Sequence, residues 1–414
     1  MRPSFYLSTA LLLQFTGFTS AHGDEHDIPV PRLFGGGAAM RQLPRHMIEE
    51  MAGRSNAIPK QQQEKQQPQK RQWTKPGQSV QPDCGPGIGY CKAGECCSPV
   101  GYCGRTQAHC ASPNCQFDYS DGCDGTKKPL GDSLLNLSRP LIGNVTYGGE
   151  GINHCHIKGK VALTFDDGPY NFTSHILDVL ASYKAKATFF ITGNNIGKGQ
   201  IDIEENGWPA ILRRMHADGH QIALHSWGHF NHSALNETQL VNQIHYVEMA
   251  VRNVLGFIPT YYRPPYDDCT TDLCKNTLKK MGYHITYQNQ VNNDWEEDDG
   301  AKIESSKDLF VKSMRQTTPR DVDYIFLQHD THYQTSYNLT NYMLDYFEIL
   351  NFTTSVTVGE CMGDPPENWY RAAGGAANHS LLLKKASSDS NVLQYSMWNM
   401  LLVLGGQILA STFL

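Results

Sequence analysis

The chain has 414 residues, with 35 Lys and Arg against 41 Asp and Glu for a net charge of −6. Nucleic-acid-binding domains usually carry a clustered basic excess, so this mildly acidic balance argues against that class, and no nucleic-acid partner is expected. The length suggests two or three domains, and the composition argues against a multispan membrane protein. Eight of the 12 cysteines lie between Cys84 and Cys123, a density that predicts an oxidising compartment.

The amino terminus has the pattern of a secretory signal peptide. A cation near the start precedes an uncharged apolar stretch at 5–18, which small residues follow. That stretch is shorter than the roughly 20 residues that a membrane-spanning helix needs, so a cleaved signal at 1–21 is expected. Residues 22–80 include a Gln-rich, charge-flanked run at 60–71 and have too little apolar surface to fold. They are predicted to be a disordered linker or a pro-segment.

The carboxyl terminus carries a second apolar segment, and no charged residue occurs from Asn391 onward. The Lys/Arg cluster that normally stops transfer of a membrane helix is missing, whereas small residues at 386–388 and a polar spacer precede the tail. This order is typical of a GPI-anchor signal, with a plain membrane helix as the alternative. We expect a linker with the attachment site at 366–390 and the signal tail at 391–414. Together with eight Asn-x-Ser/Thr sequons, these features predict a secreted glycoprotein held at the plasma membrane or cell wall only through its GPI anchor.

Short apolar strands alternate with helical stretches from about residue 155 to 361. The expected strands are at 161–165, 187–191, 221–224, 283–287, 324–328 and 355–358. The expected helices are at 174–184, 209–217, 236–255, 271–281 and 305–316. Such an alternation predicts a parallel α/β arrangement, either a barrel or an open sheet.

The cysteine-dense stretch is about forty residues long and cannot fold on apolar burial alone, so disulfides must supply its stability. A zinc site is the alternative, but no paired C-x2-C spacing occurs. Adjacent Cys96 and Cys97 are followed by a Ser, and later by a Gly-aromatic-Cys-Gly sequence. This framework resembles that of the hevein-like chitin-binding domains. We place such a module at 81–125, followed by a linker at 126–150.

The resemblance to the hevein-like domains implies a disulfide pairing and a set of sugar contacts. The implied disulfides are Cys84–Cys97, Cys91–Cys103, Cys96–Cys110 and Cys115–Cys123. Family members grip N-acetylglucosamine with a serine and exposed aromatic residues, whose positions here hold Ser98, Val100, Tyr102 and His109. Because Val100 and His109 stand where aromatics are usual, weak chitin binding is predicted. A disulfide-rich spacer is the alternative.

Polar side chains follow several of the predicted strands. Asp166 and Asp167 come directly after the first strand, and adjacent carboxylates repel each other unless a cation lies beside them. His225 and His229 follow a later strand, and with one carboxylate they make a three-ligand set with an open position, as a hydrolytic zinc requires. Further polar residues follow the strands near 262, 287 and 328. The carboxyl ends of parallel barrel strands meet on one face, so these segments are expected to share a pocket.

Five segments in this order resemble the motifs of the NodB-like polysaccharide deacetylases. They are TFDDGP at 164–169, HSWGH at 225–229, RPPY at 263–266, DW at 294–295 and LQH at 327–329. One position departs from the family pattern, because Val291 stands where an Asp is usual. The resemblance implies that residues 151–365 form an incomplete, distorted (β/α) barrel.

The resemblance assigns Asp167, His225 and His229 to the metal and Asp166 to the general base. Arg263 would keep Asp166 ionised through its opposite charge. Zn²⁺ is the expected ion, since it lowers the pKa of a bound water to about 7, with Co²⁺ as the alternative. Two histidines and a carboxylate also suit non-haem iron oxygenases, but that interpretation leaves the second carboxylate, the arginine and the distal histidine unexplained.

His329 is the expected general acid, because an amine is a poor leaving group unless it is protonated. Asp294 would hold His329 protonated and oriented. The resemblance further implies that the backbone N–H of Tyr266 binds the oxyanion and that Trp295 and Leu327 wall a small pocket for the acetyl methyl.

Four cysteines remain outside the dense stretch, and we expect the disulfides Cys155–Cys361 and Cys269–Cys274. The predicted protein is a monomeric hydrolase whose partner is chitin or a chitooligosaccharide, from which it releases acetate to leave chitosan. Two alternatives stay open. One is a deacetylase of acetylxylan or peptidoglycan, and the other is a catalytically inactive chitin lectin of the cell wall.

Overall fold

The structure is a computed structural model that describes residues 81–296 and 298–373. The predicted signal peptide, the Gln-rich segment, the GPI tail and residues 374–390 of the predicted linker therefore lie outside the described residues. Within the part of the chain that is described, no helix combines the length and the apolar character that crossing a bilayer requires.

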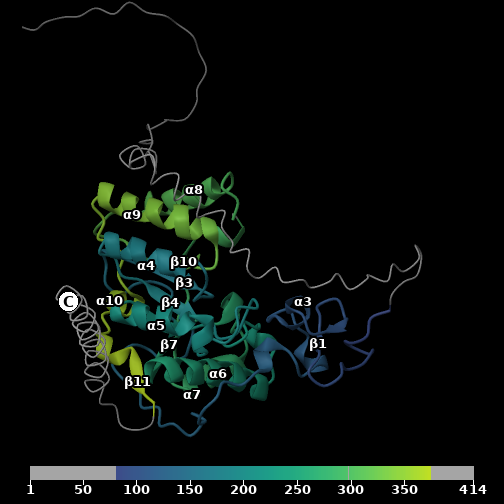
Figure 1. The fold of residues 1–414 in the computed structure, drawn as a ribbon. Helices are drawn as coiled ribbons and strands as arrows, with labels where there is room; N and C mark the ends of the chain where they lie inside the picture. The colour runs from purple at the N-terminus through teal and green to yellow at the C-terminus, as the bar shows by residue number, and fades with distance from the viewer. Residues whose placement is uncertain (1–80, 297, 374–414) are drawn as a thin grey trace, which may run out of the picture. The chain divides into compact units, whose positions relative to one another are not determined.

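A parallel sheet of seven strands forms the centre of the region after residue 150 (Figure 1). Its strands are β3 (Lys160–Asp166), β4 (Thr188–Ile191), β5 (Gln221–Leu224), β7 (Tyr261–Tyr262), β8 (His284–Ile285), β9 (Gln290–Val291) and β10 (Asp323–His329). Their order is β8-β7-β5-β4-β3-β10-β9. Within the described residues, the edge strands β8 and β9 do not pair with each other, so the sheet forms only part of a barrel. This half-barrel confirms the predicted incomplete, distorted (β/α) barrel.

Six helices surround the sheet (Figure 1): α4 (Thr173–Ser182), α5 (Trp208–Ala217), α6 (Glu237–Leu255), α7 (Asp272–Lys280), α8 (Ile303–Met314) and α9 (Thr340–Ile349). They pack against one another in the order α7, α6, α5, α4, α9, α8, which follows the order of the strands. Local sequence sets the ends of α6. Asn236 and Gln239 form a capping box at its start, and Gly256 ends it in the left-handed conformation that favours glycine.

Short elements complete the half-barrel. They are η4 (Glu204–Asn206), η5 (His232–Ala234), β6 (Phe257–Pro259), η6 (Pro265–Asp267), η7 (Asp294–Glu296), the π-helical η8 (Thr335–Leu339), α10 (Val358–Met362), η9 (Pro366–Asn368) and β11 (Tyr370–Ala372). The core lies between the sheet and the helices, where β3 is buried along nearly its whole length. Phe165 of β3 stacks on Phe189 of β4 with ring centroids 5.2 Å apart. Parallel strands covered on both faces require this kind of continuous apolar run.

Two segments near the end of the half-barrel differ from the expectation. The strand expected at 355–358 is reduced to one bridge, between Val356 and Ala162. Thr357 and Glu360 instead form a capping box that starts α10, so helix capping ends the extended run. The expected linker after 365 also begins with ordered structure, because β11 pairs antiparallel with β6.

Residues 126–150, expected to be a linker, pack on the half-barrel. Leu134 is buried with Met249 and Ile258 in one apolar cluster. Arg139 donates to Glu248 in a largely buried ion pair, with an Nη2–Oε2 distance of 2.7 Å. These contacts make the segment part of the packed half-barrel.

The cysteine-rich module is built differently. It contains β1 (Cys96–Cys97), β2 (Cys103–Gly104), α3 (Gln107–Cys110), η2 (Phe117–Tyr119) and η3 (Asp124–Thr126). Its two small buried clusters consist of half-cystines: Cys96, Cys110, Cys115 and Cys123 in one, and Cys84, Cys91 and Cys97 in the other. The module therefore relies on covalent links where the half-barrel relies on apolar burial.

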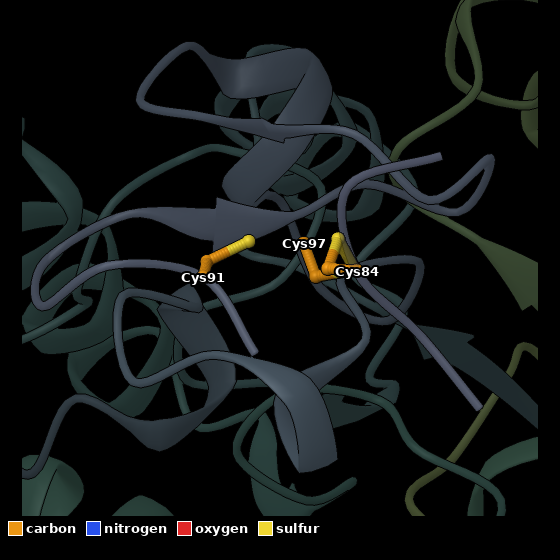
Figure 2. Close-up of side chains that lie close together, drawn as sticks. All are labelled: Cys84, Cys91 and Cys97. Carbon is orange, nitrogen blue, oxygen red and sulfur yellow. A yellow bond between two sulfur atoms is a disulfide. The ribbon is translucent and has the colours of Figure 1, made fainter. Parts of the chain in front are cut away.

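All 12 cysteines form disulfides, with the pairing expected above. The bonds are Cys84–Cys97, Cys91–Cys103, Cys96–Cys110, Cys115–Cys123, Cys155–Cys361 and Cys269–Cys274. Figure 2 shows Cys84, Cys91 and Cys97 close together. Because each of these sulfurs is used in a disulfide, the three cannot serve as thiolate ligands of a metal.

Candidate active site

The strand β3 ends in the two adjacent carboxylates. Asp166 is the last residue of β3 and is almost fully buried, while Asp167 has a φ of 76° and turns the chain. Gly168 follows, and a Cβ at this position would lie 1.9 Å from Oδ2 of Asp330. Only glycine therefore lets the turn pass this close to the end of β10.

Three side chains gather beside this turn in a geometry that fits a metal ion. His229 Nε2 lies 3.2 Å from Asp167 Oδ1 and 3.2 Å from His225 Nε2, and His225 Nε2 lies 3.8 Å from the same carboxylate oxygen. Donors bound about 2.0–2.1 Å from a tetrahedral zinc are separated by about 3.4 Å. Asp167 Oδ1 is buried and has no hydrogen-bond partner among the described residues. The three donors thus fit a divalent cation.

Protonation also suits metal binding. Burial, together with the charge of His229, lowers the pKa of His225 well below its usual value, and burial lowers the pKa of His229. Burial would raise the pKa of Asp167, but His229 and His225 bring it down to about 2. The Nδ1–H of His225 donates to the carbonyl oxygen of Arg263 at 2.7 Å, which leaves its Nε2 as the free donor. Neutral imidazoles and an ionised carboxylate are the forms that coordinate metals.

Asp166 is held by a buried arginine. Arg263 Nη1 donates to Asp166 Oδ1 at 2.7 Å and to Thr164 Oγ1 at 2.8 Å, and its guanidinium lies 4.0 Å from the ring centroid of Phe190. Burial raises the pKa of Asp166 to about 7 even though the charge of Arg263 lowers it. A carboxyl group with a pKa near neutral can accept a proton and release it again during turnover.

His329 forms a second buried pair with Asp294. The Nδ1–Oδ1 distance is 2.9 Å, and the backbone N–H of His329 donates to Asp294 Oδ2 at 2.7 Å. Burial alone would lower the pKa of His329, but the charge and hydrogen bond of Asp294 raise it to about 9. The imidazole is therefore cationic at neutral pH. Asp166 and His329 lie directly opposite each other on the paired strands β3 and β10.

The three residues predicted to contact substrate lie around these groups. The ring of Trp295 is 5.4 Å from the ring of His329 and is 40% exposed. Leu327 lies on β10 and is largely buried. Tyr266 is exposed, has a left-handed backbone at φ 59°, and its ring lies 4.6 Å from that of His229. Such backbone strain is common at functional sites.

The sequence motifs did not reveal two supporting residues, Lys198 and Thr335. Lys198 donates from Nζ to the backbone oxygens of Asp167 at 2.8 Å and Gly168 at 3.0 Å, and so fixes the turn that bears a ligand. Thr335 donates to Asp294 Oδ2 at 2.8 Å. Both lie in segments without a recognisable motif, and only the fold brings them to the site.

The predicted sugar contacts of the module are unevenly exposed. Ser98 is buried, and its Oγ accepts a hydrogen bond from the backbone N–H of Tyr102 at 3.0 Å. Tyr102 and His109 are half-buried. Val100 is 71% exposed, and Tyr90, which the motif comparison did not single out, is 58% exposed.

Comparison with known proteins shows the family. Residues 153–286 match the sequence profile described as Polysaccharide deacetylase. The chain is 38% identical over 224 residues to a chitin deacetylase of Colletotrichum lindemuthianum, and the alignment covers 54% of this chain and 88% of that protein. This chain belongs to the polysaccharide deacetylase family. The profile match includes the segments that hold Asp166, Asp167, His225, His229 and Arg263.

Two further comparisons agree with membership of the polysaccharide deacetylase family. A chitin deacetylase of Pestalotiopsis sp is 36% identical over 54% of this chain and 70% of that protein. The solved structure of the chitin deacetylase from Colletotrichum lindemuthianum matches with a TM-score of 0.52 and 37% identity, covering 57% of this chain and all of that one. As a polysaccharide deacetylase the protein is a hydrolase, so the predicted enzyme class is confirmed.

Proposed function

We propose that this polysaccharide deacetylase removes N-acetyl groups from the N-acetylglucosamine units of chitin, giving chitosan and acetate. One observation carries the proposal. A carboxyl group with a pKa of about 7, Asp166, and a cationic imidazole, His329, lie side by side on adjacent strands next to the three metal-binding donors. Hydrolysis of an amide needs this combination of a base, an acid and an electrophile.

In the proposed reaction the residues move two protons. An ion held by Asp167, His225 and His229 would polarise the acetyl carbonyl and lower the pKa of a water molecule. Asp166 accepts a proton from this water as its oxygen bonds to the carbonyl carbon. His329 donates its proton to the amide nitrogen as the C–N bond breaks, which releases the amine and leaves acetate.

The neighbouring residues bind the acetyl group in this scheme. The backbone N–H of Tyr266 donates to the carbonyl oxygen as negative charge develops on it. Trp295 and Leu327 pack against the methyl group. Asp294 raises the pKa of His329 to about 9, so the imidazole is protonated at neutral pH. A protonated imidazole suits an amine leaving group, because an amine leaves only after it gains a proton. An alcohol, the leaving group of an acetate ester, depends less on such an acid.

The choice of metal and of substrate can be tested together. The protein is freed of metal with a chelator, supplied with Zn²⁺ or Co²⁺, and incubated with chitotetraose, acetylxylan or peptidoglycan. We expect acetate from chitotetraose, fastest with Zn²⁺, and at least about tenfold less from the other substrates. Acetate mainly from acetylxylan or peptidoglycan would reassign the substrate. No acetate with any divalent ion would leave the lectin interpretation standing.

We further propose that the cysteine-rich module is a hevein-like chitin-binding domain that uses Ser98, Tyr102 and His109. The four disulfides, paired as the resemblance implies, support this proposal. Retention on chitin beads tests it. We also propose that the protein is secreted and held at the cell surface by a GPI anchor. Its six disulfides support secretion, because disulfides persist in oxidising compartments. Release of cell-surface enzyme by a phosphatidylinositol-specific phospholipase would test the anchor.

A further inference from the structure

The loop that carries both histidine ligands is strained. It follows β5 and runs from His225 to Phe230, and two of its non-glycine residues have positive φ values, 76° at Ser226 and 60° at His229. Side chains disfavour this backbone region, so such a conformation persists only where the surrounding structure enforces it. His229 itself is one of the strained residues, and its ring position depends on this backbone.

One side of the loop is held from within the half-barrel. The backbone N–H of Gly193 donates to the carbonyl oxygens of Ser226 at 3.1 Å and Trp227 at 3.0 Å, and the N–H of Asn194 donates to Trp227 at 2.7 Å. These bonds come from the loop after β4, on the neighbouring strand. They reach the middle of the histidine loop but do not extend to Gly228 or Phe230.

The other side of the loop is linked to the cysteine-rich module through Gln243, a buried residue of α6 in the half-barrel. The N–H of Gly228 donates to Gln243 Oε1 at 2.7 Å, and Gln243 Nε2 donates to the carbonyl oxygen of Gly125 at 2.9 Å. Gly125 lies in η3, two residues after the last cysteine of the module. A Cβ on Gly228 would lie 2.9 Å from the Cα of Gly125, so the two backbones touch and neither glycine has room for a side chain.

Aromatic packing adds to this contact. The rings of Phe117, in the module, and Phe230, next to His229, meet edge to face with centroids 4.5 Å apart. A Cβ on Gly125 would lie 2.3 Å from the ring of Phe230, which is itself buried. The module therefore encloses the end of the histidine loop on two sides.

The module also contacts the loop after β4 that supports the histidine loop from the other side. The N–H of Ile196 donates to the carbonyl oxygen of Ser112 at 2.7 Å, and Asn194 Nδ2 donates to that of Asp124 at 2.9 Å. Ser112 Oγ in turn accepts a hydrogen bond from the N–H of Gly125 at 2.6 Å. One edge of the module thus braces both loops next to the metal-binding donors.

We propose that the cysteine-rich module is part of the metal site, and that Gln243 and Phe117 are positioning residues that keep the His225–Phe230 loop in its ligand-binding conformation. The inference rests on the proposed function, since it takes His225 and His229 as ligands. A loop that reaches the competent conformation only part of the time binds its ion with an apparent dissociation constant raised by the inverse of that fraction. The module then contributes to metal binding independently of any binding of chitin.

Two variants of the full-length protein test this role. Gln243→Leu removes both bridging hydrogen bonds at similar volume, and Phe117→Leu weakens the aromatic contact from the module side. Asp118→Ala is the matched control, because Asp118 is an exposed residue of η2 whose carboxylate accepts a hydrogen bond from Gln239 Nε2 of α6 at 2.7 Å, outside the contacts to Gly228 and Phe230 described above. The zinc dissociation constant is measured by chelator competition, and hydrogen exchange of the Gly228 and His229 amides reports the loop itself.

We expect a zinc dissociation constant about tenfold or more higher in Gln243→Leu, a smaller rise in Phe117→Leu, and faster exchange of the loop amides in both. Asp118→Ala should match the wild type. If Gln243→Leu does not fold, Phe117→Leu decides alone. Wild-type zinc affinity in Phe117→Leu, or an equal loss in Asp118→Ala, would overturn the inference while leaving the metal site intact, because a loss in Gln243→Leu alone shows only that α6 supports the loop. If the wild-type protein and an Asp167→Asn variant bind zinc equally, the proposed metal site fails instead.

Discussion

The half-barrel and the cysteine-rich module reach stability in different ways. In the half-barrel, β3 and β10 are largely buried and carry apolar runs, so the hydrophobic effect supplies most of the stability. The module has only two small buried clusters, and these consist of half-cystines. One region can therefore place polar, strained groups at its rim, because a large core supports them. The other depends on its covalent links.

The difference also concerns chemistry. Asp166 and His329, whose pKa values are strongly perturbed, are neighbours at the carboxyl ends of β3 and β10. The module contributes no acid or base to this pocket in the described contacts. Its contribution to turnover would be indirect, through the loop that bears His225 and His229. Variants in the half-barrel site should therefore lower turnover, whereas variants in the module should act on the conformation of the loop that bears the two histidines.

The largest effect is expected from Asp166→Asn. The amide cannot accept the proton of the attacking water, and positioned acid–base groups contribute roughly 10²–10⁴-fold to rate, so acetate release from chitotetraose should fall by about that factor. Zinc binding should be retained, because Asp166 is not among the three donors. An Asp118→Ala variant, altered only at an exposed residue of the module, should keep the wild-type rate on this soluble substrate. Normal turnover in Asp166→Asn would refute the assignment of the base.

Disulfide removal should affect the two regions differently. Replacing Cys96 and Cys110 by serine removes a link from a module without an apolar core, and a loss of about 2–5 kcal/mol should unfold the module locally. Replacing Cys155 and Cys361 should lower the melting temperature of the half-barrel but leave it folded, since its core persists. Limited proteolysis and calorimetry distinguish these outcomes. If the module without Cys96 and Cys110 still resists proteolysis, its stability does not depend on this disulfide, and the proposed contrast with the half-barrel is wrong.

The parts of the site that could be predicted from sequence are those next to strong strand signals. The apolar run at Val161–Phe165 predicts a buried strand. Asp166 and Asp167 follow at its carboxyl end, where parallel barrels carry their catalytic residues. The same logic located His225 and His229 after β5. Here the local pattern and the topology agree, so the sequence sufficed.

Contacts between distant segments could not be predicted. Gln243 is one polar residue on an amphipathic helix, and nothing local indicates that it joins Gly125 to Gly228. Thr335 lies 41 residues from Asp294 in a segment without a motif. The strand expected near 355–358 failed for another reason, since the Thr357–Glu360 capping box was a readable signal that favoured a helix.

The pH dependence sharpens the description of the half-barrel. His329 has a pKa of about 9, so the acid form needed for turnover is lost as the pH rises through 9. In Asp294→Asn the largest raising influence is gone, while burial still lowers the pKa of His329 and the charges of Asp167 and Asp166 still raise it, so the pKa should fall to about 6.5. At pH 8 the protonated fraction would drop from about 90% to about 3%, a rate loss of about 30-fold. The pH profile of kcat/KM checks this, with the alkaline limb moving to lower pH.

The same pair contributes to stability with a defined sign. Because the pKa of His329 is raised on folding, the pair stabilises the fold fully below about pH 6.5, and this contribution is lost as the pH rises through about 9. Asp294→Asn should remove that pH dependence from the melting temperature. An unchanged alkaline limb together with an unchanged melting profile would show that Asp294 does not set the pKa of His329.

The smallest effect is expected at the proposed sugar-binding face of the module. Tyr102 is half-buried, and Val100 stands where the hevein-like resemblance implies a stacking aromatic, so little ring surface is left to cover a sugar. Tyr102→Ala should weaken retention on chitin beads only about fivefold, or about 1 kcal/mol, whereas Val100→Trp should strengthen it by restoring a platform. Both variants should keep the zinc affinity of the wild type, since the contacts described above between the module and the His225–Phe230 loop run through Gly125 and Phe117. If Val100→Trp leaves retention unchanged, the module is a disulfide-rich support for the metal site and not a chitin anchor.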